Sequence, residues 1–543
     1  MPSQDIIRYA FVGGVVSKHY LNRSDLTKYD VGALIARNFF IDPRGGLVSR
    51  VGSELIAPMK YPRKKTRFFR FHGTVSDFNI ELGHEYMRVI QNGGYSLEPT
   101  FSVTNITTAD PAVFTAAAHG LSNGDWLYIV STSSETTYTN RYFVVGNVTT
   151  NTFELTDPGF NPIDGTTFAG GTTAVVAKVF ELATPFNSED LDKISFAQNK
   201  NEIRLTHSSY PRKKVNFISA ANWTISDVET SSALASPENI TLTPSAAGDV
   251  GIAVVVTALN SDGVESLGSE YALTQTSVNY STTAGSLQIT WDPVPGAKSY
   301  NVYRSILVPG TPEVTKGEST GYIGTAYGAQ FNDINITPDF TKTPPIFSDP
   351  FAPGTILGID LTAVGSGYSK ADTVSVSGGG GTGFDGYPIV SDSGEITAIS
   401  IVNGGSGYSS PVTVTIGTSG GSGATFDVEV GPDTGLNPGL YQVVQRRGIY
   451  FGTENQPSSL WASRPYLQDN YDVSSTVNAD DPYSFEIDAV SVKPISHVLA
   501  LRSGLLLFND DGVTQLRAES GKAITGSNAL SEPQAYVAIG DTP

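Results

Sequence analysis

Residues 63–71 read RKKTRFFRF and form the stretch of the sequence that best fits contact with a nucleic acid. Cationic side chains attract phosphates and aromatic rings stack on bases, so the combination suits such a contact. The same composition also fits an edge strand protected by Lys and Arg, or a surface that meets an acidic neighbouring subunit. The adjacent arginines at 446 and 447 are open to the same interpretations. The candidate residues for contact with DNA or with another subunit are Arg63, Lys64, Lys65, Arg67, Arg70, Arg446 and Arg447.

Patterns typical of catalysis or of cofactor binding are not found in the sequence. The 6 histidines show no paired spacing, and the glycine run at 378–381 is not followed by the Gly-Lys-Ser or Gly-Lys-Thr of a phosphate-binding loop. There is no Gly-x-Ser-x-Gly elbow. Neighbouring carboxylates, such as Asp480 and Asp481 or Asp510 and Asp511, are typical of solvated turns as well as of acid-base or calcium sites. We therefore predict that the chain is not an enzyme and has no catalytic residue, metal site or cofactor.

The composition predicts a mainly β chain of several domains. A length of 543 residues corresponds to roughly three to five domains. Charged residues make up 16% of the chain, and 56 glycines with abundant Thr, Val and Tyr favour turns and strands. Cysteine is absent, so packing or assembly must supply the stability. No long apolar run or signal peptide is found, which predicts synthesis in the cytoplasm and no integral membrane segment.

The net charge of −19 argues against sequence-independent gripping of DNA by the whole surface. Such binding depends on Lys and Arg that displace the counterions of the phosphates. Two interpretations of the acidity remain open. It is typical of an ordinary soluble protein, and it also suits a channel wall along which DNA slides without sticking.

Pattern changes along the chain divide it into six segments. Asp42 to Gly46 form a turn signal between two apolar runs, and the acidic residues that follow Ser188 predict the start of a short helix. The pentapeptide YPRKK occurs at 61–65 and again at 210–214, which indicates either two related hairpins or a chance match. The predicted segments are an N-terminal platform segment (1–97), an inserted small β barrel or sandwich (98–180), a platform segment with the short helix (181–215), a fibronectin type III-like region (216–345), a glycine-rich insertion of two repeats (346–437) and a C-terminal platform or propeller segment (438–543).

The fibronectin-like region departs from the usual strand order. LQITWDPVPGAKSYNVYRS resembles the tryptophan-containing strand and its successor, with Trp291 in one sheet and Tyr300, Val302 and Tyr303 on the next strand. The strand that ends in NSDG at 260–263 normally follows these strands, whereas here it precedes them. One rearranged sandwich and two degenerate ones are both compatible with this order. The glycine-rich insertion that follows repeats with a period of 40, which aligns Tyr368 with Tyr408.

Three motifs, RNFFIDPRGGLVSR, ELGHEYMRVIQNGG and ENQPSSLWASRP, resemble the tail tubular protein B or tail nozzle family of short-tailed bacteriophages. The resemblance covers about 1–97, 180–350 and 438–543, and it continues from PPIFSDPF (344–351) to the tryptophan segment at 447–465 across the glycine-rich insertion. It implies a partial β-propeller-like platform that carries inserted sandwich and barrel modules. Family members usually continue beyond the position of Pro543, so further blades are expected to be absent here or on another chain.

The resemblance also implies a function as a virion protein of the phage tail. Six copies would form a ring below the tail adaptor, near the tail fibres or spikes, and genomic DNA would pass through the ring transiently. The inserted modules would face outward. The alternative is a virion or extracellular adhesin that binds host glycans through its β-sandwich modules. A tail-borne depolymerase would require two converging carboxylates, which the sequence does not supply.

Overall fold

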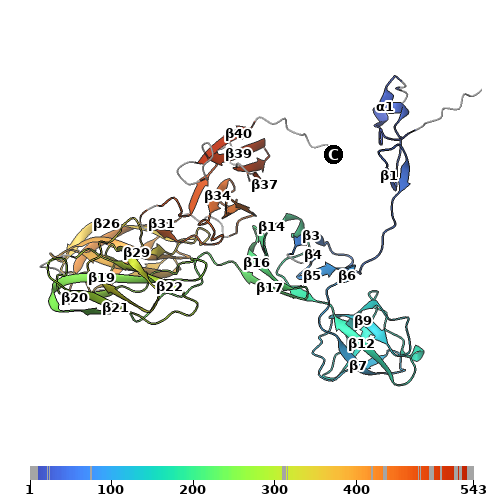
Figure 1. Ribbon diagram of the computed structural model, residues 1–543, viewed down its shortest axis with the longest axis horizontal. Coiled ribbons are helices and arrows are strands. Elements are labelled where there is room, and N and C mark those ends of the chain that lie inside the picture. Colours follow the sequence, from blue (N-terminus) through green and yellow to red (C-terminus); the bar gives the residue numbers. More distant parts are fainter. Residues whose placement is uncertain are drawn as a thin grey trace, which may run out of the picture. The chain divides into compact units, whose positions relative to one another are not determined.

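Figure 1 shows the fold of the chain as a computed structural model. Strands make up 48% of the structure and helices 3%, which confirms the prediction of a mainly β protein with several sheets. The chain forms two compact units: Met1–Lys60, Gly93–Tyr95 and Val103–Ala174 form unit 1, and the remaining residues form unit 2. The structure describes residues 10–20, 23, 25–73, 76–307, 314, 316–417, 420–431, 437–474, 476, 478–487, 494–501, 504–510, 512–518, 524 and 529–534.

Unit 1 begins with a short hairpin. Strands β1 (Phe39–Ile41) and β2 (Leu47–Ser49) pair in antiparallel fashion on either side of the predicted turn. The amide of Asp42 donates a hydrogen bond to the carbonyl of Gly46 at 2.9 Å, which closes this turn. The helical turns that precede the hairpin are η1 (Lys18–Tyr20) and α1 (Thr27–Asp30).

The second part of unit 1 is a closed six-stranded barrel, so the choice between a barrel and a sandwich is resolved. Phe114 and Phe153 are fully buried inside it, with stacked rings whose centroids are 5.6 Å apart. Tyr95 of the short strand β6 (Gly94–Tyr95) packs on Tyr142 of the barrel at 5.4 Å. The barrel contains β7 (Phe101–Ile106), β8 (Val113–Thr115), β9 (Trp126–Thr132), β10 (Arg141–Gly146), β11 (Thr152–Thr156), η2 (Gly165–Thr167) and β12 (Thr172–Lys178).

Unit 2 begins with two antiparallel sheets that share one hydrophobic core. Phe71, Phe78 and Trp223 meet edge to face or tilted at the centre of this core. The first sheet has the order β13-β5-β4-β3, and the second is a meander from β14 to β17. The strands are β3 (Arg67–His72), β4 (Asp77–Gly83), β5 (Tyr86–Gln91), β13 (Glu181–Ala183), β14 (Ser195–Asn199), β15 (Glu202–His207), β16 (Tyr210–Ser219) and β17 (Asn222–Asp227).

Two local sequence patterns can be compared with the structure in this region. The predicted helix after Ser188 is only one turn, η3 (Leu191–Lys193), because β14 follows immediately and the Asp190 carboxylate accepts a hydrogen bond from the Tyr210 hydroxyl at 2.7 Å instead of capping a helix. The two YPRKK pentapeptides are not equivalent positions of a duplicated hairpin. The copy at 61–65 lies in turns and bends before β3, whereas the copy at 210–214 begins strand β16.

Residues 241–333 form a single rearranged sandwich of three and four strands with one core. Trp291 follows β21 directly and packs on Tyr300 of β22, with ring centroids 5.2 Å apart. The long strand β19, which ends at the NSDG turn, pairs with β22 although it precedes it in the chain. The sheet orders are β18-β21-β24 and β20-β19-β22-β23, with β18 (Thr241–Pro244), β19 (Ala247–Leu259), β20 (Ala272–Ser277), β21 (Leu287–Thr290), β22 (Ser299–Arg304), β23 (Gly321–Ala326) and β24 (Gln330–Asp333).

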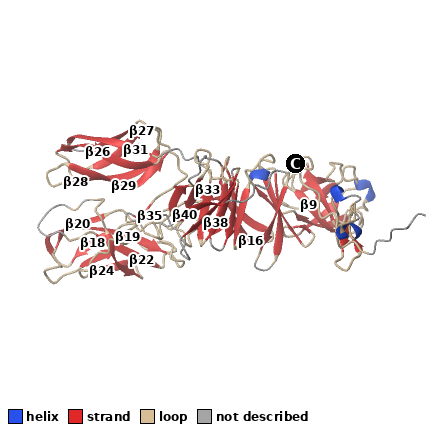
Figure 2. Ribbon diagram, turned by 90° about the horizontal axis from the view of Figure 1, so that it is seen from above, coloured by secondary structure: helices blue, strands red, loops and turns tan. Residues whose placement is uncertain are grey.

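The glycine-rich repeat folds as two units related by an internal two-fold axis. Ile356 pairs with Val430, and the residues 40 positions away, Ile396 and Val390, pair with each other in the same way. The axis passes next to the pair formed by Ser375 and Thr415. Figure 2 shows that this module, like the sandwich, consists of strands and loops. Its strands are β26 (Ile356–Ser366), β27 (Thr373–Gly378), β28 (Thr382–Val390), β29 (Ile396–Ser406), β30 (Val412–Gly417) and β31 (Ser422–Val430).

The C-terminal part of unit 2 contains two further four-stranded meanders. Both faces of the first are buried: Ile449 and Leu460 point into the core shared with the second meander, whereas Tyr450 and Trp461 point to the opposite side. The strands of the first are β32 (Leu440–Val444), β33 (Arg447–Phe451), β34 (Ser459–Ala462) and β36 (Tyr483–Glu486), and those of the second are β37 (His497–Leu501), β38 (Gly504–Asn509), β39 (Gly512–Ala518) and β40 (Ala529–Gln534).

Candidate functional site

Strand β3 carries the basic and aromatic stretch and is the edge strand of its sheet. Its residues alternate in the way that a half-buried strand requires: Phe69 and Phe71 enter the core, whereas Phe68 and Arg70 are exposed. This position agrees with the interpretation that cations protect an edge strand from pairing with other chains. It also leaves the outward-facing side chains accessible.

The five basic candidates of this stretch differ in their hydrogen-bond and ion-pair partners within the protein. The guanidinium group of Arg67 donates to the carbonyls of Leu191, at 2.9 Å, and of Ile194, so it holds the η3 turn. Lys65 forms an ion pair with Asp192 at 3.0 Å. Arg70 pairs with Asp77 on the neighbouring strand, and this contact lowers the pKa of the Asp77 carboxyl.

The remaining two, Arg63 and Lys64, lie in the exposed turn that precedes β3. The ammonium group of Lys64 lies over the ring of Tyr61, 5.2 Å from its centroid. Of the five cations, these two are therefore the ones best placed for a phosphate or for an acidic neighbouring subunit.

Arg446 and Arg447 are neighbours in sequence with opposite environments. Arg446 is exposed at the turn between β32 and β33, in a left-handed conformation with φ of 70°, and its guanidinium lies 4.6 Å from the centroid of the Tyr466 ring. Arg447 is 5% exposed and donates hydrogen bonds to the carbonyls of Ser463 at 2.6 Å and Asp481 at 2.9 Å. Burial lowers the pKa of Arg447. Only Arg446 of this pair presents its charge to solvent.

The tryptophan segment forms a joint between distant parts of the sequence. Phe351, which lies before the glycine-rich repeat, packs on Tyr450 and on Trp461, with ring centroids 5.3 Å apart in both cases. The guanidinium of Arg212 lies 4.3 Å from the centroid of the Phe351 ring. Beside the joint, strand β25 (Pro345–Ile346) pairs with β35 (Val473–Ser474). The structure thus brings together the segments that the sequence separates by the inserted repeat.

Charged groups fasten the same joint. Arg204 of β15 forms an ion pair with Asp469 in the loop after β34, and its Nε lies 3.1 Å from Oδ2. The hydroxyl of Tyr450 donates to the same carboxylate at 3.3 Å. Burial raises the pKa of Tyr450 far above its usual range, so this phenol stays protonated. This arrangement is that of a structural contact, since the charges and the phenol are engaged with one another.

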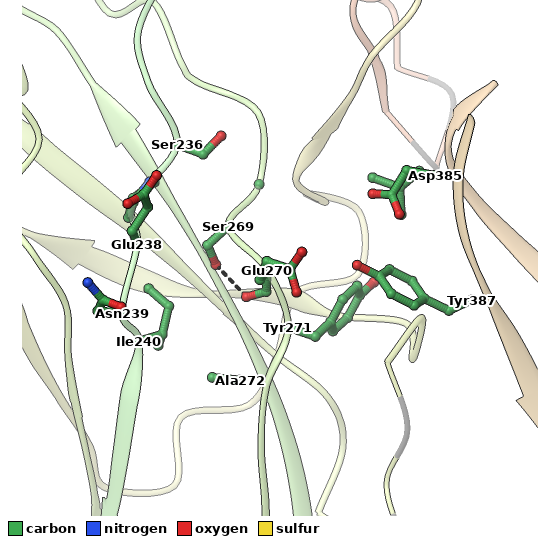
Figure 3. A pocket seen from close by; sticks show the side chains of 13 residues that line it. Ser236, Glu238, Asn239, Ile240, Ser269, Glu270, Tyr271, Ala272, Asp385 and Tyr387 are labelled. Atoms are coloured by element: carbon green, nitrogen blue, oxygen red, sulfur yellow. Dashed lines mark hydrogen bonds between the residues drawn. The ribbon is translucent and has the colours of Figure 1, made fainter. Parts of the chain in front are cut away.

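A pocket of about 550 Å³ lies between the fibronectin-like sandwich and strand β28 of the glycine-rich repeat (Figure 3). Tyr271 and Tyr387 meet edge to face in its wall, with centroids 5.9 Å apart. Lys316 forms an ion pair with Glu270 at 3.0 Å and lies over the Tyr387 ring. The carboxylates that line the pocket are Glu238, Glu270 and Asp385.

The electrostatics of this pocket disfavour additional negative charge. Burial raises the pKa of Tyr271 and of Tyr387, in each case to about 12. Burial and then the nearby Glu270 raise the pKa of Asp385, although part of that side chain remains exposed. Carboxylates accept hydrogen bonds from hydroxyls and attract cations, and tyrosine rings offer flat apolar faces. The pocket therefore suits a neutral polyhydroxylated ligand or a cationic one.

The sequence alone does not reveal this pocket, because the side chains that line it come from two different modules, the sandwich and the repeat. None of the side chains named above for this pocket lies in a motif, so no signal in a single sequence identifies them.

The neighbouring carboxylates considered in the sequence do not line this pocket. Asp481 pairs with Arg464 at 2.7 Å within the fold. The second member of the pair Asp510 and Asp511 lies outside the described residues.

The described residues contain no group of three or more His, Cys, Asp or Glu side chains arranged to hold a metal ion. None of the helices in the described part of the chain combines the length and the apolar character that crossing a lipid bilayer demands. No protein-family model matches the sequence, and no curated protein sequence is significantly similar to it. The function is therefore inferred from the residues and from their geometry.

Proposed function

We propose that this chain is a structural virion protein of a short-tailed bacteriophage, located in the tail. Copies of the chain would form the ring-shaped nozzle or tube below the tail adaptor, through which DNA leaves the particle. The motifs shared with the nozzle family suggest this function. One structural observation supports it further, namely the arrangement of the four-stranded meanders in unit 2.

Unit 2 contains three four-stranded meanders, and their first strands lie side by side: β32 is adjacent both to β14 and to β37. A β-propeller consists of such four-stranded sheets arranged around a central channel. The joint of Phe351 with Tyr450 and Trp461 keeps the meanders in contact across the inserted repeat. We infer that they are blades of a partial propeller-like platform, and that the barrel, the sandwich and the repeat are insertions that decorate it.

The charge distribution is compatible with passage of DNA. With 53 acidic and 34 basic residues, the chain offers few cations that could retain phosphates by releasing counterions. In this proposal Arg63, Lys64 and Arg446 contact the acidic surface of a neighbouring subunit, or DNA during its passage. Lys65, Arg67, Arg70 and Arg447 have partners within the fold and stabilise it.

Imaging of the purified full-length chain tests the ring. Negative-stain images and mass photometry are expected to show a closed ring, which we expect to be six-fold. A monomer at every concentration, or an open filament, would contradict the proposal.

Charge reversal tests the role of the exposed cations. Arg63→Glu combined with Lys64→Glu is expected to reduce the population of rings. The matched control is Lys200→Glu combined with Lys298→Glu, which makes the same change of charge at two other exposed positions. Equal effects of the two double variants would show that net charge, and not this turn, controls assembly.

A second function, binding of host glycans by an adhesin, is favoured by the pocket that contains Tyr271 and Tyr387. Its rings and carboxylates suit a sugar with several hydroxyls. A glycan array probed with the full-length chain tests this function, with Tyr387→Ala as the pocket variant and Tyr327→Ala as the control, since Tyr327 is exposed on the same sandwich. Binding that Tyr387→Ala abolishes and Tyr327→Ala preserves would favour the adhesin.

A further inference from the structure

Residues 10–60 are here called the N-terminal arm, and backbone hydrogen bonds connect its described residues. The amide of Gly13 donates to the carbonyl of Val31 at 2.8 Å, and the amide of Val16 donates to the carbonyl of Ala33 at 2.9 Å. A third hydrogen bond joins Phe11 to Gly45 at 3.0 Å. These contacts cross between three parts of the arm, and the β1–β2 hairpin adds its own ladder. The arm therefore has a defined shape and is more than a linker.

This shape has almost no hydrophobic interior. Among the described residues of the arm, Ala33 is the only hydrophobic side chain that is buried. Phe39 and Phe40 are adjacent on β1 and thus point to opposite faces of the hairpin, yet they are 49% and 61% exposed. The other exposed large hydrophobic residues of the arm are Val12, Val15, Tyr20, Leu34, Ile35, Val48, Val51, Leu55 and Ile56.

A segment of this kind requires a covering surface. An isolated two-stranded hairpin is at best marginally stable in water, and a chain of this length rarely folds without a core or a staple. Contiguous exposed apolar side chains mark a contact surface more often than a free one. Because both faces of the hairpin are apolar, a cover on one side only would leave the other face exposed.

Charge identifies the kind of partner. The arm contains seven Lys or Arg and four Asp or Glu, whereas the whole chain contains 34 basic and 53 acidic residues. The arm is therefore cationic, and all of the negative net charge belongs to the rest of the chain. A second copy of this chain offers the complementary acidic surface, and opposite charges favour encounter and specificity.

We propose that the N-terminal arm is an exchange arm that binds a second copy of this chain, with the Phe39 and Phe40 faces of its hairpin buried on that copy. Such a contact is heterologous, because the arm of one copy meets a different surface of the next. Repeated around an axis, it joins successive copies into a ring. The inference goes beyond the proposed nozzle function, since it applies to any assembly of this chain.

Photo-crosslinking tests the exchange directly. The chain has no cysteine, so Phe40→Cys provides a single attachment site for benzophenone maleimide on the full-length protein. Illumination is expected to produce covalent dimers and higher multimers on a denaturing gel. The crosslinks should lie in a second copy of the chain, outside its own N-terminal arm, where the net charge is negative. Tyr327→Cys, at a position 84% exposed on the sandwich, is the control site. Crosslinks that remain within one chain, or that match those of the control, would overturn the proposal.

Substitution provides the second test. Phe39→Ser combined with Phe40→Ser is expected to weaken self-association by about tenfold or more, because aromatic anchors dominate the affinity of interfaces. The control, Phe160→Ser combined with Tyr327→Ser, removes two aromatic rings outside the arm that are even more exposed, at 69% and 84%. None of the four rings is buried, so circular dichroism and the melting temperature should not change.

The two proposals fail in different ways. Rings that persist in the double variant of the arm would overturn the exchange and leave the nozzle function standing. Dimers or filaments that depend on the arm would support the exchange and contradict the nozzle ring. A full-length chain that stays monomeric at all concentrations would overturn both.

Discussion

The fibronectin-like sandwich and the glycine-rich repeat are neighbours in the chain but are stabilised in different ways. In the sandwich, alternate residues of β19 from Val250 to Ala258 are buried in a broad hydrophobic core. The buried core of the repeat is small, and the buried rings of Tyr368 and Tyr408 lie instead against glycines of the opposite repeat. The core of the sandwich depends on alternating apolar side chains, which can pack together when the order of the strands is changed. In the repeat, each ring packs directly on the backbone of a glycine, and this contact leaves no space for an additional atom.

Loss of a buried charge in the sandwich should have the largest effect. Nε of Arg304 lies 2.7 Å from Oδ2 of Asp333, both side chains are buried, and the Tyr280 hydroxyl donates to the same carboxylate. Asp333→Ala leaves the guanidinium buried without its counterion, so we expect a loss of about 3–5 kcal/mol in the free energy of unfolding. Hydrogen exchange of the β19 amides measures this loss for the sandwich itself. Asp262→Ala, in an exposed turn, is the control, and a similar loss there would contradict the explanation.

Addition of one methyl group to the repeat should have the next largest effect. A Cβ atom at Gly381 would lie 2.3 Å from Cγ of Tyr408, and one at Gly421 would lie 2.3 Å from Cδ1 of Tyr368. Gly381→Ala and Gly421→Ala should each destabilise the repeat by about 1–3 kcal/mol, since the ring must move. Gly328→Ala, in open space on the sandwich, should have little effect. Denaturant unfolding that separates the two repeat variants widely would refute the two-fold equivalence.

Removal of one hydroxyl tests whether the tyrosines of the repeat act only through their rings. The backbone amide of Ala424 donates to the Tyr368 hydroxyl at 3.0 Å, and the side chain is 9% exposed. Tyr368→Phe should therefore cost about 0.5–1.5 kcal/mol in thermal or chemical unfolding. An unchanged stability would show that the ring contact with Gly421 suffices.

A change of pH should produce the smallest effect on stability, through Asp385, which lines the pocket on the side of the repeat. Burial and Glu270 raise the pKa of Asp385 in the folded chain, so the folded state binds this proton more tightly than the unfolded state. Its contribution is then fully present below the ordinary pKa of aspartate and is lost as the pH rises through the raised value. Asp385→Asn should slightly increase the melting temperature at pH 7, and the increase should disappear on acidification. An increase that is the same at every pH would contradict this origin.

Much of the fold could be predicted from the sequence, because strands, turns and repeats depend on local patterns. The alternation of apolar residues, the Asp42 to Gly46 turn and the period of 40 each correspond to an element of the structure. The short helix predicted after Ser188 forms as the single turn η3, because the next strand begins two residues later. The two copies of YPRKK show that local sequence does not always determine local structure, because identical residues form a turn before β3 in one copy and the start of β16 in the other.

The candidate sites could be predicted only in part. The basic character of β3 is visible in the sequence, but the partners that engage Lys65, Arg67 and Arg70 come from η3 and β4. Burial of Arg447 beside exposed Arg446 depends on carbonyls far along the chain. The pocket and the uncovered arm depend on which surfaces meet, and a single sequence does not contain that information.

The two-fold axis beside Ser375 and Thr415 has a consequence for the origin of the glycine-rich module. Every strand of the first repeat pairs with a strand of the second. Because the two repeats are equivalent, each repeat contains both kinds of strand that such a pair requires. Two separate copies of one repeat would satisfy the same ladders as a homodimer. The present module thus has the geometry of a dimer fused into one chain, and during translation its first half must wait for the ribosome to deliver the second.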